Sequence, residues 1–150
     1  MVMSKILLLN YRSYLTMSSF GTFFMLVCLA WLISCSTGKV KKTHSGLQYT
    51  KLRKGSGPKA KVGQQILLFE TTRYRNGTVL YSNENTTTPV KVLIGGKQAT
   101  QAVDEALRGM KAGEVKEITA PPYLVKRTAY PPNVHPDSTL IIKLILHKIL

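Results

Sequence analysis

The chain has 150 residues, with 21 lysines and arginines against 7 aspartates and glutamates, and a formal net charge of +14. Both cysteines, Cys28 and Cys35, lie in the first quarter of the chain, so the remainder has no thiol for a disulfide, a thiolate nucleophile or a thiolate metal site. The composition predicts one domain that is stabilised by packing and has an anionic neighbour.

Residues 1–34 predict a lipoprotein signal peptide. Lys5 and Arg12 form its positive leading region, residues 20–33 its apolar segment, and Cys35 would become the lipidated first residue of the mature chain. An uncleaved transmembrane helix is the alternative, but the apolar run is shorter than the roughly 20 residues that a span needs. A start at Met17 would weaken the signal without removing it. We therefore expect a bacterial envelope protein, lipid-anchored to a membrane and facing the periplasm.

Residues 35–46 are small, polar and basic, and they predict a lipidated flexible tether before a folded domain over 47–150. Lys39, Lys41 and Lys42 would supply the second signal that stable membrane attachment needs, through anionic lipid headgroups. A plain solvated basic surface is the alternative. Nucleic acid is a poorer partner, because the basic residues are scattered and no basic-aromatic stripe accompanies them.

The first half of the domain predicts strands. Residues 66–74 are rich in strand formers, and Asn76-Gly77 then gives the strongest short hairpin signal before a strand over 79–81. Residues 83–88 form a polar loop, Pro89 opens a short strand that ends at Ile94, and two glycines follow it.

The second half contains one helical pattern and two more strands. Apolar residues recur at helical spacing from Ala102 to Met110, a brief strand covers 115–120, and a Pro-rich loop covers 121–137. The last strand, over 139–150, places Lys143 and His147 on one face and its apolar residues on the other, namely Leu140, Ile142, Leu144 and Leu146. Antiparallel strands and one short helix predict an α+β fold.

From residue 45 to 150 the chain resembles the FKBP-type peptidyl-prolyl isomerases. The order and spacing of several short pieces carry the resemblance: Ser45-Gly46-Leu47-Gln48-Tyr49, Lys54-Gly55-Ser56-Gly57, Val62-Gly63-Gln64, Asn76-Gly77-Thr78-Val79, residues 107–113, Pro121-Pro122 and residues 136–141. The resemblance implies an antiparallel sheet wrapped around one short helix, with a shallow pocket for proline-containing polypeptides between helix, sheet and the long loop. It also implies prolyl isomerisation without metal or cofactor.

The family's pocket positions fall on nine residues of this chain. They are Glu70, Leu80, Tyr81, Ala99, Thr100, Val103, Lys126, Val134 and Ile142. Most of the family's pocket rings are replaced here, which implies weak activity; a non-catalytic FKBP-like chaperone or peptide-binding module is the alternative. No catalytic nucleophile can be named, and a basic domain lying against the membrane is a third hypothesis.

Four aromatic residues are candidates to replace the missing rings. A bulge would turn Phe69 inward in place of Glu70, and Tyr81, Tyr123 or Tyr130 would swing in from the hairpin or the loop. Each has a rim or packing role as its alternative. Glu70 and Lys126 would pair across the pocket mouth, or remain solvated.

The three histidines, His44, His135 and His147, have no carboxylate or cysteine at ligand spacing, so we expect no metal site. The long N-terminal dimerisation helix of some secreted relatives has no counterpart, and we expect a monomer that assists the folding of envelope proteins.

Overall fold

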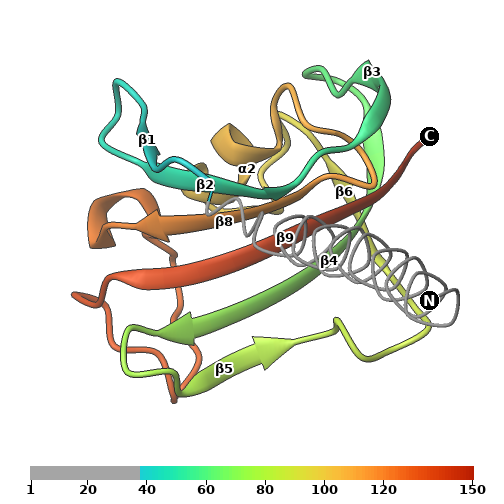
Figure 1. Cartoon of the computed structure of the whole chain (residues 1–150). Coiled ribbons are helices and arrows are strands. Elements are labelled where there is room, and N and C mark those ends of the chain that lie inside the picture. Colours follow the sequence, from blue (N-terminus) through green and yellow to red (C-terminus); the bar gives the residue numbers. More distant parts are fainter. Residues whose placement is uncertain (1–37) are drawn as a thin grey trace, which may run out of the picture. The chain divides into compact units, whose positions relative to one another are not determined.

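The central strand of the main sheet is β9, Leu140–Ile149, which pairs antiparallel with β4 on one side and with β8 on the other (Figure 1). The computed structural model describes residues 38–150 of the chain. Alternate side chains of β9 point into the hydrophobic core, while His147 is exposed at its far end. The predicted alternation of the last strand is thereby confirmed, and its buried residues are Leu140, Ile142, Leu144 and Leu146.

The main sheet has seven strands in the order β1-β2-β8-β9-β4-β5, and β6 pairs with the first part of β4. A separate two-stranded sheet joins β3 to β7. The strands are β1 Lys41–Lys42, β2 Gln48–Arg53, β3 Ser56–Lys59, β4 Gln65–Tyr74, β5 Val79–Ser82, β6 Val90–Leu93, β7 Lys111–Ala112 and β8 Val115–Ala120. A short 3-10 helix, η1 Pro122–Leu124, opens the long loop.

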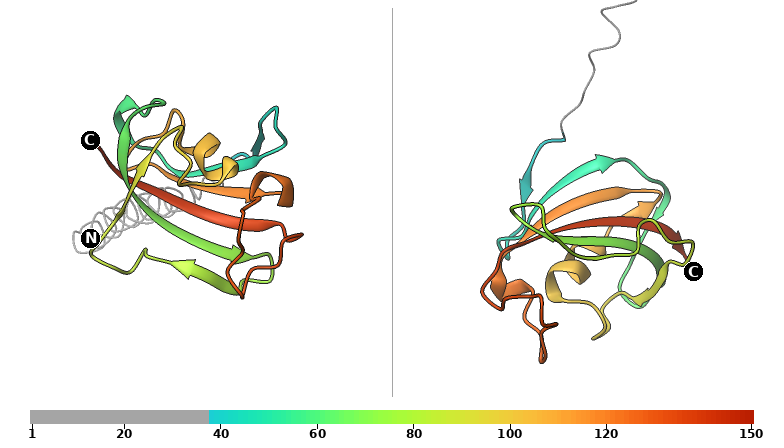
Figure 2. Two further views of the ribbon diagram at one scale, coloured as in Figure 1. Left: turned by 180° about the vertical axis from the view of Figure 1, so that it is seen from behind. Right: turned by 90° about the horizontal axis from the view of Figure 1, so that it is seen from below.

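The α-helix of the described part of the chain, α2 (Gln101–Leu107), lies beneath the curved sheet, whose strands arch over it (Figure 2). Its apolar side chains face the sheet and are buried there: Ala102, Val103, Ala106 and Leu107. The predicted antiparallel sheet around one short helix, and with it the α+β class, is confirmed. Within residues 38–150 no helix has the length and apolar character to cross a membrane.

A buried lysine ties the end of α2 to the sheet. Lys116, on β8, donates a hydrogen bond from Nζ to the carbonyl oxygen of Ala106, in the last turn of the helix. The ammonium also lies 5.1 Å from the centre of the Tyr49 ring. Burial lowers the pKa of Lys116 to about 8, and the neighbouring Glu114 carboxylate offsets part of that effect. A cation at a helix C-terminus is favourable because the carbonyl ends carry partial negative charge.

The Asn76-Gly77 hairpin is confirmed, because it joins β4 to β5 and Gly77 has a φ of +93°, a backbone angle that favours glycine. The predicted helical pattern ran too far. The helix ends at Leu107, and Gly109, with a φ of +77°, turns the chain after it. Met110 is fully buried, but it lies beyond the end of the helix.

The N-terminal part of the domain holds structure that the sequence did not predict. Strands β2 and β3 were missed, and Lys41–Lys42, placed in the expected flexible tether, forms β1 against Gln48 and Tyr49 of β2. Ordered sheet thus begins before the boundary expected at Leu47. The signal peptide and Cys35 lie outside the described residues.

Removing one core side chain of β9 tests its central role. Leu144 is 0% exposed, and we expect Leu144→Ala to lower the free energy of unfolding by about 2–5 kcal/mol because the neighbouring strands cannot close the cavity. Leu150, which is 52% exposed just after the strand, provides the matched control. Urea unfolding followed by circular dichroism measures both variants. Equal midpoints for Leu144→Ala and Leu150→Ala would contradict the assignment of the core.

Candidate functional site

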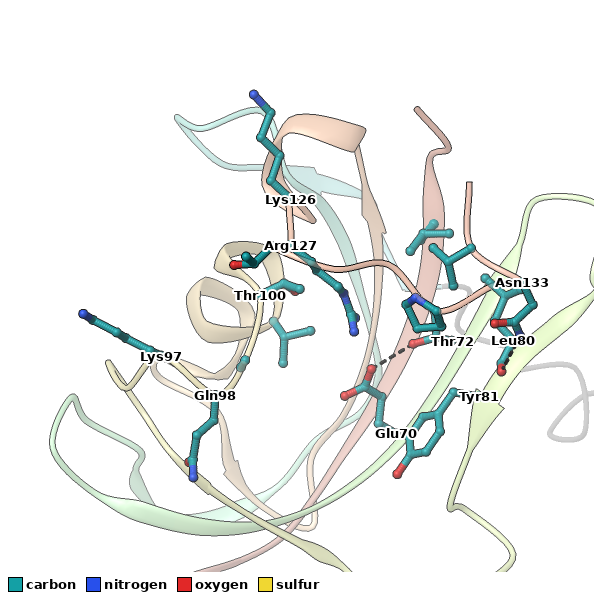
Figure 3. A pocket seen from close by; sticks show the side chains of 16 residues that line it. Glu70, Thr72, Leu80, Tyr81, Lys97, Gln98, Thr100, Lys126, Arg127 and Asn133 are labelled. Atoms are coloured by element: carbon teal, nitrogen blue, oxygen red, sulfur yellow. Dashed lines mark hydrogen bonds between the residues drawn. The ribbon is translucent and has the colours of Figure 1, made fainter. Parts of the chain in front are cut away.

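A cavity of about 900 Å³ opens beside the N-terminal end of α2. The helix and the segment before it form one wall, β4 and β5 form the opposite wall, and the loop between β8 and β9 lies across one side (Figure 3). The lining residues are Glu70, Thr72, Leu80, Tyr81, Lys97, Gln98, Ala99, Thr100, Val103, Lys126, Arg127, Thr128, Pro131, Asn133, Val134 and Leu140.

The apolar part of the lining comes from five different parts of the fold. Val103 reaches the cavity from α2, Ala99 from the segment before it, Leu80 from β5, Leu140 from the start of β9, and Pro131 and Val134 from the long loop. Among the lining residues, Tyr81 is the sole aromatic side chain. The apolar part of the lining is therefore mainly aliphatic, and polar and charged side chains lie among it. The aliphatic side chains can remove water from a bound group, which contributes roughly 25 cal/mol per Å² of apolar surface buried.

The structure brings all but one of the nine predicted pocket positions to this cavity. The exception is Ile142, which is fully buried and does not line it. Ile142 lies opposite Thr72 of β4 and Ile118 of β8, in the middle of the sheet, where its neighbours cover it. Leu140, two residues earlier on the same face of β9, takes the lining position because it lies where the strand begins.

Of the candidate replacement rings, Tyr81 lines the cavity, and Phe69, Tyr123 and Tyr130 do not. Phe69 stays on the other face of β4, where its ring meets that of His147 edge-on at 5.7 Å. The irregularity of β4 against β9 falls between Leu67 and Leu68, before Phe69, and leaves Glu70 facing the cavity. Tyr123 donates a hydrogen bond to the carbonyl of Ser45, and the ring of Tyr130 lies outside the lining.

Glu70 is a partly buried carboxylate that lines a cavity with both polar and apolar walls. Thr72 Oγ1 donates a hydrogen bond of 2.8 Å to Glu70 Oε1, and Asn83 fixes the backbone of Glu70 through two hydrogen bonds. Burial raises the pKa of Glu70 above its ordinary value of 4.5, while the Thr72 hydrogen bond and the charge of Arg127 act in the opposite direction. Glu70 thus binds its proton more tightly than a solvated glutamate.

The cation that faces Glu70 is Arg127 and not Lys126. Figure 3 shows the Arg127 side chain extending toward Glu70, whereas Lys126 extends away from the cavity. No ion pair within 4.0 Å links Glu70 to Lys126 among the described residues. The expected pair across the mouth is therefore wrong, because neighbouring residues of an extended loop point in different directions.

The long loop is fixed to the hairpin beside the cavity. Tyr74, at the end of β4, donates its hydroxyl hydrogen to the carbonyl of Asn133 at 2.9 Å and accepts a hydrogen bond from the backbone N–H of His135, also at 2.9 Å. Asn133 Nδ2 donates to the carbonyl of Leu80 at 3.2 Å. These contacts hold Val134 in the cavity wall.

Several lining residues were not foreseen. The lining positions of Thr72 and Leu140 follow from strand alternation. Thr72 lies two residues after Glu70, and Leu140 lies two residues before Ile142, each on the same face of its strand. Lys97, Gln98, Arg127, Thr128, Pro131 and Asn133 belong to irregular segments, where the sequence gives no direction for a side chain. Within the described residues, no group of three histidine, cysteine, aspartate or glutamate side chains is arranged to hold a metal ion.

A comparison with known families decides which class this fold and cavity represent. The family model for the FKBP-type peptidyl-prolyl cis-trans isomerases matches residues 57–147. The chain belongs to this family. The match contains the hairpin, α2, the long loop and most of β9, so the resemblance noted in the sequence is confirmed for the domain.

Curated relatives within the FKBP family are longer than this chain. The peptidyl-prolyl cis-trans isomerase Mip of Coxiella burnetii is 35% identical over 112 residues, which are 71% of this chain and 46% of that protein. FK506-binding protein 4 of Dictyostelium discoideum is 33% identical over 106 residues, 70% of this chain and 29% of the relative. The chain thus spans less than half the length of these two relatives. The crystal structure of AtFKBP13 has a TM-score of 0.66 and 23% identity, covering 75% of this chain and 99% of that chain.

The buried carboxyl of Glu70 makes a prediction about stability and pH. Its pKa is raised on folding, so folding with a charged Glu70 becomes less favourable as the pH rises above about 4.5. We expect Glu70→Gln to leave stability unchanged at low pH, where both side chains are neutral, and to stabilise the protein at pH 7. Urea midpoints measured from pH 3 to pH 7 give the comparison.

Glu84 provides a control for which the expected effect of pH on stability has the opposite sign. The hydrogen bond with Lys143 lowers the pKa of Glu84. The contribution of the charged Glu84 to the stability of the fold is therefore present above about pH 4.5 and is lost as the pH falls through the lowered pKa. Glu84→Gln should therefore destabilise the protein at pH 7 and have little effect at low pH. The same sign for both variants would show that Glu70 is not desolvated.

Proposed function

We propose that this FKBP domain catalyses the cis–trans isomerisation of peptidyl-prolyl bonds in polypeptide substrates. The observation that carries the proposal is the cavity of about 900 Å³, which has aliphatic side chains and most of the family's pocket positions on its walls and lies open to solvent. A proline ring and the residue before it can pack against those aliphatic side chains. The rest of a polypeptide can leave the cavity over its rim.

Rotation about the X-Pro bond is opposed by amide resonance, with a barrier of about 18–20 kcal/mol. The planar amide has the more polar carbonyl oxygen, and water stabilises it by hydrogen bonds. Walls such as Leu80, Val103 and Val134 would remove that water, so the twisted amide is favoured relative to the planar one. This mechanism needs no nucleophile.

Two polar side chains can orient the bound segment. Arg127 extends into the cavity as a hydrogen-bond donor for a peptide carbonyl (Figure 3), and Glu70 is an acceptor whose direction Thr72 fixes. Because Glu70 holds its proton more tightly than a solvated glutamate, it can also donate to an acceptor at mildly acidic pH. Holding the segment on both sides of the bond limits rotation to the bond that must turn.

The cellular setting is a further part of the proposal. A lipid on Cys35 would place the domain at the bacterial envelope, where folding polypeptides that contain proline are its substrates, and Lys39, Lys41 and Lys42 would lie near anionic headgroups. The support is the sequence alone, because Cys35 precedes the described residues.

Catalysis is tested with a short X-Pro peptide and the purified full chain. We expect exchange between the cis and trans forms, measured by NMR, to be faster than the uncatalysed process of tens to hundreds of seconds. Tyr81 lines the cavity and is 48% exposed, and we expect Tyr81→Ala to lower kcat/KM about three- to tenfold, the value of one aromatic contact.

The control is Tyr123→Ala. Tyr123 is 53% exposed and lies outside the cavity, so its removal should leave kcat/KM unchanged. A folded protein that gives no acceleration at all would overturn catalysis and support the non-catalytic peptide-binding module.

The anchor is tested by labelling cells that express the full chain with a radioactive fatty acid. We expect label on the wild-type protein and none on Cys35→Ser, because the thiol at position 35 is the proposed attachment point. Cys28→Ser is the matched control, since Cys28 lies inside the predicted signal peptide and should leave the labelling unchanged. Equal labelling of the wild type and Cys35→Ser would remove the anchor.

A further inference from the structure

Two smaller cavities along β6 adjoin the main one and share lining residues with it. A second cavity of about 220 Å³ lies between β6 and α2, and it shares Glu70, Tyr81 and Val103 with the first. A third, of about 340 Å³, lies beside Leu93 at the end of β6. Gln98 lines all three. The hollows along β6 therefore offer a surface beside the main cavity for residues next to a bound proline.

The charged side chains along these cavities are mostly positive. Four cations line them and Glu70, which is partly buried, is the one carboxylate; the cations are Lys91, Lys97, Lys126 and Arg127. None of the four takes part in an ion pair within the described residues 38–150. The carboxylates that do form ion pairs bind other cations, which are Lys51, Arg73, Arg108 and Lys143.

The cations flank the entrance to the cavity on two separate segments. Lys97 comes from the segment before α2 and Lys126 from the long loop, and in Figure 3 both side chains extend away from the cavity into solvent. Arg127 extends inward, toward Glu70. A polypeptide that places a proline in the cavity must pass over these segments on its way out, so side chains a few residues from the proline come within reach of a positive charge.

We propose that the preferred substrates are acidic prolyl segments, in which aspartate or glutamate residues lie near the proline. The inference rests on the proposed function, whose substrate class it specifies. Unpaired cations at the rim attract the carboxylates of a substrate, and no buried group has to lose its water for this. Their effects on the rate of encounter and on binding affinity add up over several contacts. Neutral prolyl segments use the same cavity without that contribution, and basic ones are disfavoured by it.

The experiment compares two peptides that share the core Ala-Pro-Phe and carry either glutamate or glutamine on both sides of it. The full chain is assayed at an ionic strength of about 0.01 M, where the Debye length is about 30 Å. We expect kcat/KM to be about three- to tenfold higher for the glutamate peptide, in line with one or two exposed ion pairs. The advantage should shrink as salt is added.

Charge variants separate the rim from the net charge of the protein. Lys97→Gln and Lys126→Gln should each reduce the ratio between the two peptides about two- to threefold. Lys59→Gln is the matched control, because Lys59 is exposed on β3, outside all three cavities, and loses the same charge. A ratio near one, or an equal loss in Lys59→Gln, would overturn the proposal.

Failure of catalysis is distinguishable from failure of this inference. When neither peptide is isomerised, the proposed activity fails, and fluorescence anisotropy of the same two labelled peptides then measures binding alone. Tighter binding of the glutamate peptide that Lys97→Gln weakens supports the acidic preference without catalysis. Equal binding of the two peptides, or no binding of either, overturns it.

Discussion

Strand β9 pairs with β4 on one edge and with β8 on the other, while every second side chain from Leu140 to Leu146 lies in the hydrophobic core. The period of two in its apolar residues fixes this orientation, since a shift of one residue would turn the whole apolar set to solvent. Because β4 and β8 pair with β9, the orientation of its buried face also determines where these two strands lie. The position of β4 in turn determines the position of the β4–β5 hairpin. The cavity is located where this face reaches the start of β9, at Leu140.

The site depends on this framework through a few polar contacts. Thr72 and Glu70 are held by the same strand that pairs with β9, so their mutual hydrogen bond is positioned by the sheet. The long loop has little regular structure, but the Tyr74 hydroxyl and the Asn133 amide attach it to the β4–β5 hairpin. These hydrogen bonds tie the loop wall of the cavity to the strands, and positioned walls are what orientation of a bound segment requires.

Much of the fold followed from local patterns, and the failures have physical causes. Alternation identified β9, and Asn76-Gly77 identified the β4–β5 hairpin, because these signals act within a few residues. Strand β2 escaped because it is mostly exposed near the edge of the sheet and its register breaks between Lys51 and Arg53. Eight of the nine family positions line the cavity, and they lie on strands, on α2 and in irregular segments. Ile142 does not line it, and Lys126 extends away from it, because neighbours that only the folded chain brings together decide exposure.

The absence of most aromatic rings from the cavity bears on binding more than on bond rotation. Rings contribute apolar area and specific contacts, whereas the lowering of the rotational barrier comes from removing water from the amide, which Val103, Leu80 and Leu140 can also do. Aliphatic side chains in place of rings offer less apolar area to a proline ring. Charge at the rim would compensate for that loss, because it acts over a longer distance than packing and needs no close fit. Under these conditions substrate choice depends on residues beside the proline as much as on the proline itself.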